Sequence, residues 1–150
     1  MKIERFIKNA VPYGFMLKAN NERWFSDGQM TIKLPEYYGE LGNMHKDNKG
    51  LIAILNNSDF GENPATLKKA YLPYPDSKAS DIMRVFSDGE DEVAITNKQF
   101  GMIEKADMCV IATVYDEENE ENTYNVLLIG KYSSIEDFEP EAIILNQMED

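Results

Sequence analysis

The sequence predicts an α+β protein in which antiparallel sheets are combined with two short helices. Strand-like runs of apolar and β-branched residues are separated by Asp-Gly turn signals, as in "WFSDGQMTI" and "VFSDGEDEVAI". Two other segments, residues 3–10 and 98–106, carry apolar residues at helical spacing. The 150 residues, of which 43% are hydrophobic, are enough to bury a core, and we expect one domain over residues 1–150.

Residues 1–35 predict a helix followed by a β-meander. The helix ends before Pro12, and its apolar face is formed by Ile3, Phe6, Ile7 and Ala10. Three strands are expected, at residues 13–19, 22–25 and 29–34. The turns between them fall at Asn20-Asn21 and Ser26-Asp27-Gly28, because Asn, Asp and Gly tolerate the left-handed backbone of tight hairpins.

Residues 36–80 predict an irregular middle segment. The stretches "GNMHKDNKG" and "NNSDFGENP" are rich in turn residues, and "LPYPDSKAS" is typical of a Pro-rich loop. The run "LIAILNN" fits either a short buried strand or a helical turn, since periodicity does not decide at that length. We expect "PATLKKAYL" to form a helical turn.

Residues 81–147 predict a strand pair, a helix, a long hairpin and a closing strand. The strands "IMRVF" and "DEVAI" are joined by the second "SDG", which we interpret as the same hairpin joint as the first and not as a shared binding motif. Thr96 or Asn97 is expected to cap the helix at 98–106. The hairpin is formed by "MCVIATVYD" and "TYNVLLIGKY", and "EAIILN" closes the sheet.

The side chains offer no catalytic, cofactor or metal-binding signature. His45 is the only histidine, so a catalytic triad or a histidine-rich metal site lacks a second imidazole. There is no phosphate-binding Gly-rich loop, and "DEENEE" lacks the alternation and central glycine of a calcium loop. Cys109 lies in an apolar run and is expected to be a buried small hydrophobe. We therefore expect no enzyme, no cofactor and no metal.

The location of the protein is predicted from the absence of apolar blocks. No stretch approaches the ~20 residues of a membrane span, and the N-terminal segment lacks the apolar block of a signal peptide. One cysteine fits a reducing compartment. We expect a soluble, cytoplasmic protein that does not contact a membrane.

Charge is distributed unevenly along the chain. The formal net charge is −12, but residues 1–75 hold ten basic and eight acidic groups while residues 76–150 hold five basic and 19 acidic groups. This asymmetry indicates two faces with different electrostatic roles, or else an ordinary solvated acidic surface.

Trp24 is expected in the core. Four tyrosines lie in loop-like segments, where they either bind a protein or pack under the loops: Tyr37, Tyr38, Tyr71 and Tyr74.

The order of elements repeats in outline. "IERFIKNAVPYGFMLKANNERWFSDG" runs from a helix into a hairpin, and "NKQFGMIEKADMCVIATVYDEENEENTYNVLLIG" does so again before "PEAIILNQ". This layout resembles one domain of the DNA sliding clamps, the processivity factors of replication. The resemblance covers about two thirds of the chain and rests on element order, while a bacterial clamp chain has three such domains.

The resemblance implies a function and a DNA-facing surface. In sliding clamps the helices line the DNA side and the sheets form the outer wall. The resemblance therefore implies a non-enzymatic accessory protein of DNA replication, for which a phage is one candidate source. Such a protein would form homo-oligomers around duplex DNA. The cations on the helix faces would meet phosphates without fixed base contacts. They are Arg5, Lys8, Lys98 and Lys105.

Two alternative functions remain open. A small acidic protein can mimic DNA and inhibit a basic nucleic-acid-binding protein, as phage counter-defence and anti-CRISPR proteins do. Its partner-binding carboxylates would then be Asp88, Glu90, Asp91, Glu92, Glu117, Glu118, Glu120, Glu121, Glu136, Asp137 and Glu139. The other alternative is an acidic interaction module with no connection to DNA.

Overall fold

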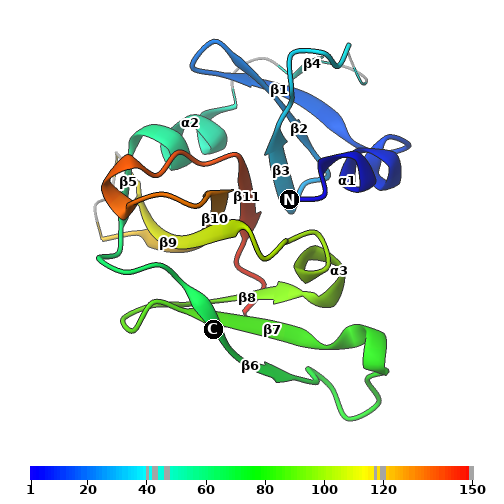
Figure 1. Ribbon diagram of the computed structural model, residues 1–150, viewed down its shortest axis with the longest axis vertical. Helices are drawn as coiled ribbons and strands as arrows, with labels where there is room; N and C mark the ends of the chain where they lie inside the picture. The colour runs from blue at the N-terminus through cyan, green and yellow to red at the C-terminus, as the bar shows by residue number, and fades with distance from the viewer. Residues whose placement is uncertain (40, 42–43, 46–47, 117, 119–120, 149–150) are drawn as a thin grey trace.

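Two sheets and three α-helices make up the computed structural model, which describes residues 1–39, 41, 44–45, 48–116, 118 and 121–148 (Figure 1). An eight-stranded sheet has the order β4-β1-β2-β3-β11-β10-β9-β5, and a three-stranded sheet has the order β6-β7-β8. All pairs are antiparallel except β1 with the two-residue β4 (Met44–His45). The α+β class predicted from the sequence is therefore confirmed.

The N-terminal helix and meander form as predicted. Their bounds are α1 Ile3–Ala10, β1 Phe15–Ala19, β2 Glu22–Ser26 and β3 Met30–Lys33. Phe6, Ile7 and Ala10 of α1 are buried. Asn20 and Asn21 adopt φ angles of 52° and 63°, which allow the two-residue connection between β1 and β2.

The middle segment is more regular than predicted. It contains α2 (Lys49–Asn56), β5 (Ser58–Phe60), β6 (Thr66–Tyr71) and a 3-10 turn, η1 (Ala79–Asp81). The ambiguous run "LIAILNN" lies in α2, whose first turn is capped by Asn48 Oδ1 accepting from Leu51 N at 2.7 Å. The prediction of a helical turn at "PATLKKAYL" is wrong, because this stretch forms the edge strand β6.

The C-terminal half contains the predicted strand pair, hairpin and closing strand. The elements are β7 Met83–Ser87, β8 Glu92–Thr96, α3 Asn97–Phe100, β9 Asp107–Tyr115, β10 Thr123–Lys131, η2 Ile135–Asp137 and β11 Ala142–Leu145. Helix α3 spans one turn, where the sequence predicted residues 98–106. The hairpin β9–β10 pairs over nine residues, from Thr123↔Tyr115 to Lys131↔Asp107.

The repeat expected from the sequence is visible in the sheet order. Each of two units consists of a helix, a hairpin and a third strand, namely α1-β1-β2-β3 and α3-β9-β10-β11. Their third strands, β3 and β11, pair with each other at the centre, and the other strands follow outward in the same order on both sides. The two units are thus arranged symmetrically about the β3–β11 seam.

The eight-stranded sheet is covered on both faces. One face packs against α1, the segment after α3 and the three-stranded sheet, with Phe6, Met102 and Ile95 in one core cluster. The other face packs against α2 and Phe138. Strands buried on both faces show continuous apolar runs, which is why "MCVIA" and "VLLI" carry no polar alternation.

None of the helices in the described part of the chain is long and apolar enough to cross a membrane.

The two "SDG" copies form the same turn. Asp27 Oδ1 accepts from Gln29 N and Met30 N at 2.9 and 2.8 Å, and Asp88 Oδ1 accepts from Glu90 N and Asp91 N at the same distances. The preceding serine accepts from the glycine N–H in both copies. Gly28 and Gly89 have φ of 96° and 99°. The prediction of one hairpin joint used twice is confirmed.

Candidate functional site

The helix side of the larger sheet carries three of the four predicted DNA-facing cations on helices. Burial of Phe6, Ile7 and Ala10 turns Arg5 and Lys8 of α1 toward solvent. Lys98 is exposed on α3, which packs against the same face of the sheet. Both helices lie on the same side of the molecule, at the right in Figure 1. We call this surface the helix face, defined by Arg5, Lys8 and Lys98.

Lys105 does not belong to that helical surface, so its predicted position is wrong. The capping box of Thr96 and Gln99 starts α3, but the helix ends at Phe100 and Gly101. Asp107 then accepts from Glu104 N at 2.8 Å and turns the chain into β9, because a local side-chain bond competes with helix continuation. Lys105 is exposed on this connection.

The N-terminus strengthens the same connection. The Met1 ammonium lies 2.7 Å from Glu104 Oε1 and 2.9 Å from Asp107 Oδ1, and Lys2 N donates to Met102 O at 2.9 Å. The start of α1 is therefore tied to the segment that follows α3. These bonds fix the two helices of the helix face relative to each other.

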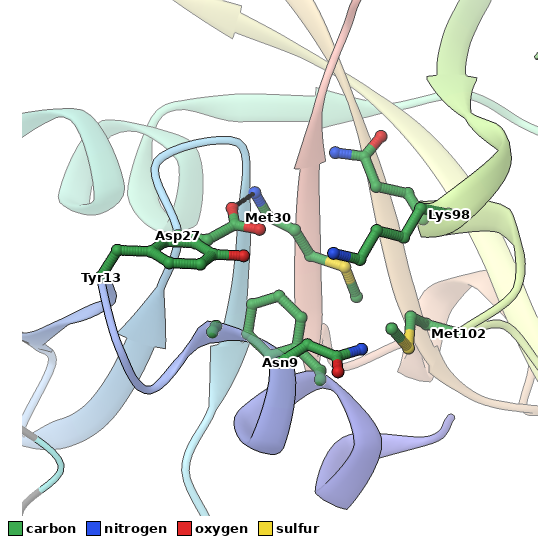
Figure 2. Close-up of a pocket in the computed structure, with 9 residues that line it drawn as sticks. Asn9, Tyr13, Asp27, Met30, Lys98 and Met102 are labelled. Atoms are coloured by element: carbon green, nitrogen blue, oxygen red, sulfur yellow. Dashed lines mark hydrogen bonds between the residues drawn. The ribbon is translucent and has the colours of Figure 1, made fainter. Parts of the chain in front are cut away.

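A small pocket separates α1 from α3 (Figure 2). Phe6, Met30 and Met102 contribute its apolar lining, while Asn9, Tyr13, Asp27, Lys98 and Gln99 contribute its polar lining. The cavity volume is about 30 Å³. That is room for only one or two water molecules.

The predicted acidic segments gather around strand β5. A Cβ on Gly61, just after β5, would collide with Asp88 Oδ2, so the β7–β8 turn lies against this segment. The ring of Phe60 in β5 contacts that of Phe138, next to η2, with centroids 5.8 Å apart. The pKa of Tyr115, at the end of β9, is raised by its hydrogen bond to Asp59 and also by the charges of Asp59 and Asp91.

We call this surface the acidic edge. Its exposed or half-buried carboxylates within the described residues are Asp59, Glu62, Glu90, Asp91, Asp116, Glu118, Glu121, Glu136, Asp137 and Glu139. In Figure 1, β5, the β7–β8 turn and η2 lie at the left, on the side opposite α1 and α3. The predicted residues Glu117 and Glu120 lie outside the described residues.

Two of the predicted acidic residues serve the fold instead. Asp88 is 8% exposed, and its Oδ1 is used within the turn, so its carboxylate does not reach the surface as predicted. Glu92 pairs with Lys68, which lowers the pKa of the Glu92 carboxyl. The other described residues of the predicted acidic set are exposed or half-buried.

The aromatic and sulfur-containing candidates divide between core and surface. Trp24 is buried, as predicted. Tyr37 is 78% exposed with its ring 4.9 Å from that of Tyr38, and Tyr74 is 62% exposed. Cys109 is buried, as predicted, and burial raises the pKa of its thiol to about 12. Among the described residues, no three His, Cys, Asp or Glu side chains are grouped to hold a metal ion.

Sequence analysis missed a cleft beside α2. An apolar part of about 300 Å³ is lined by residues that include Leu17, Ile54 and Ile143. A more open part of about 580 Å³ lies between α2 and the end of the β9–β10 hairpin, and the two parts share Gly50 and Tyr124. The signal in the sequence was the cap Asn48 followed by Leu51 and Ile54, which share a helix face.

Comparisons with known proteins found no match among protein-family models, curated proteins or solved structures.

Proposed function

We propose that the protein is a non-enzymatic, clamp-like module that contacts duplex DNA through its helix face as part of an oligomer. The observation that carries this proposal is the symmetric pair of helix–hairpin–strand units, which brings both helices to one side of a continuous sheet. This is the layout that the sequence resemblance implies for a clamp domain. Contact with phosphates alone suits a protein that holds DNA without reading its sequence.

The charge distribution supports this orientation. Arg5, Lys8 and Lys98 are exposed on the helix face, and the acidic edge lies on the far side. Negative charge around β5 would repel DNA from the outside of the module and leave the helix side as the favourable approach.

Duplex binding measured against salt tests the proposal. If three phosphates are neutralised, affinity should fall about 40-fold between 50 and 200 mM salt. The variant Arg5→Ala/Lys8→Ala should weaken binding at every salt concentration and reduce the salt slope by about 2. The control Lys49→Ala/Lys78→Ala removes the same charge from exposed positions on α2 and before η1, and should leave binding unchanged. Equal effects of the two variants, or no binding by the wild type, would contradict the proposal.

A second function, inhibition of a basic nucleic-acid-binding protein, is favoured by the acidic edge. Acidic segments far apart in the sequence meet around β5, and their described carboxylates are exposed or half-buried except for that of Asp88. A basic groove of the partner that binds the phosphate backbone of DNA would meet a similar negative electrostatic field at the acidic edge.

Charge reversal on the acidic edge tests this second function. The variant Glu90→Lys/Glu136→Lys should abolish salt-sensitive binding to a captured DNA-binding protein. Glu4→Lys/Glu36→Lys makes the same charge change at exposed positions outside this edge and should retain binding. Binding that survives the first variant, or falls equally with both, would rule out this function.

A further inference from the structure

Two strand edges of opposite charge are open in the described structure. β5 ends the eight-stranded sheet and β6 ends the three-stranded sheet, so each pairs on one side only. From Thr66 to Ala70, every residue of β6 is exposed. Unpaired edges present main-chain N–H and C=O groups to any strand that fits.

The side chains at the two edges differ in sign. β6 carries Lys68 and Lys69, both exposed, in a protein of net charge −12. β5 carries exposed Asp59, and Glu62 follows it. Each edge also exposes a large apolar side chain: Phe60 is 38% exposed on β5 and Leu67 is 44% exposed on β6.

Like edges are poor partners for each other. Two copies of β6 side by side would bring their Lys69 residues together, next to Lys68 residues that each already pair with Glu92, and two copies of β5 would bring their Asp59 residues together. Like charges across neighbouring strands are destabilising, and lysine on an edge strand is a known guard against such pairing. A strand that carries acidic side chains is therefore the favourable pairing partner for the lysine-bearing edge of β6.

We propose that the β5 edge of one copy pairs with the β6 edge of a second copy of this chain. The pairing would set Lys68 and Lys69 near Asp59 and Glu62 and cover Phe60 and Leu67. The two edges lie at different places on one molecule, β5 at the upper left and β6 at the bottom of Figure 1, so one copy can use both. A contact between two different surfaces produces a ring or a filament.

This inference deepens the proposed function, because it names the surfaces that would close an oligomer around DNA. Its own test needs no DNA. Solution mass is measured by light scattering on a sizing column over a range of concentrations. The wild type should form multiples of 17.2 kDa, whereas Lys69→Glu and Asp59→Lys should each remain monomeric. The matched control Lys49→Glu, on α2, should assemble like the wild type.

Mixing the two variants gives the sharpest result. A Lys69→Glu copy keeps its acidic β5 edge and has a β6 edge with reversed charge at position 69. An Asp59→Lys copy keeps its basic β6 edge and has a β5 edge with reversed charge at position 59. Each edge of one copy then has an edge of opposite charge on the other copy, so an equimolar mixture should assemble although neither variant does alone. Since Asp59 also bonds Tyr115, the experiment is repeated with Glu62→Lys in its place. A wild type that stays at 17.2 kDa, variants that assemble normally, or mixtures that stay monomeric would overturn the inference.

The outcomes also separate this inference from the proposed function. Assembly by edge pairing without DNA binding would leave the inference standing and contradict the clamp-like function. DNA binding through the helix face by a strictly monomeric protein would overturn the inference alone.

Discussion

The two helix–hairpin–strand units occupy equivalent positions but differ in how they are built. In the first, α1 has eight residues with no side-chain cap, and its strands have four or five residues. In the second, α3 has four residues closed by a capping box, and its hairpin strands have nine residues each. The sheet seam and the shared core, rather than helix length, therefore determine where the helices lie.

The seam between the units should be the most sensitive part of the fold. Ile144 of β11 is fully buried and pairs with Met30 of β3. Ile144→Ala should destabilise the protein by about 3 kcal/mol, because it removes buried methyl groups and leaves a cavity. Ile52→Ala, at a position 37% exposed on α2, is the control and should cost clearly less. Urea denaturation of both variants checks the difference, and equal losses would mean that the seam is not central.

The two "SDG" turns should respond alike to loss of their glycines. No atom lies within 4 Å of a Cβ built at Gly28 or Gly89, so Ala introduces only backbone strain at positive φ. Each substitution should cost about 1 kcal/mol. Gly39→Ala, also in open space but without positive φ, should be nearly neutral. Midpoints of thermal unfolding that differ widely between the two turn variants would break the equivalence.

The stability contributed by the N-cap residue should differ between α1 and α3. Thr96 Oγ1 accepts from Gln99 N at 3.1 Å, and Gln99 Oε1 accepts from Thr96 N at 2.9 Å. Thr96→Ala should therefore cost about 1 kcal/mol. Lys2→Ala should cost little, since Lys2 makes no side-chain cap to α1. Chemical denaturation of the two variants measures the contrast, which disappears if α3 is held only by packing.

The turns should also differ in their effect on DNA binding, which is the smallest expected effect. Asp27 lines the pocket that Lys98 also lines, whereas Asp88 belongs to the turn beside β5. Asp27→Asn keeps the Oδ1 acceptor of the turn and removes a negative charge near the helix face. Duplex affinity should rise about twofold, the scale of an exposed charge interaction. Asp88→Asn should not change it, and an equal rise would indicate a general effect of net charge.

Local sequence signals were sufficient for most of the fold, and their limits have physical causes. The helix at Ile3–Ala10 and the buried hairpin were predicted because one face or both faces of each are apolar. Strand β6 was missed because neither of its faces is buried, so "TLKKAY" carries no alternation. The early end of α3 is accompanied by the bond from Glu104 N to Asp107 and by contacts of the Met1 ammonium, which joins this segment only after folding.

Exposure of most predicted site residues followed from the local sequence, but their arrangement as a surface did not. Exposure of Arg5, Lys8 and Lys98 follows from the apolar spacing around them. The meeting of the acidic segments around β5 depends on contacts such as Phe60–Phe138, which join elements far apart in the chain. No local pattern in one sequence records such a contact.

Retention on circular DNA is the most direct test of the clamp-like function. The protein is allowed to assemble in the presence of closed circular duplex, and the complex is isolated at moderate salt before and after the circle is cut once. The account predicts that the protein stays with the circle and is released from the linear form, because an assembly that encircles DNA can slide off an end. Equal retention on both forms, or on neither, would contradict it.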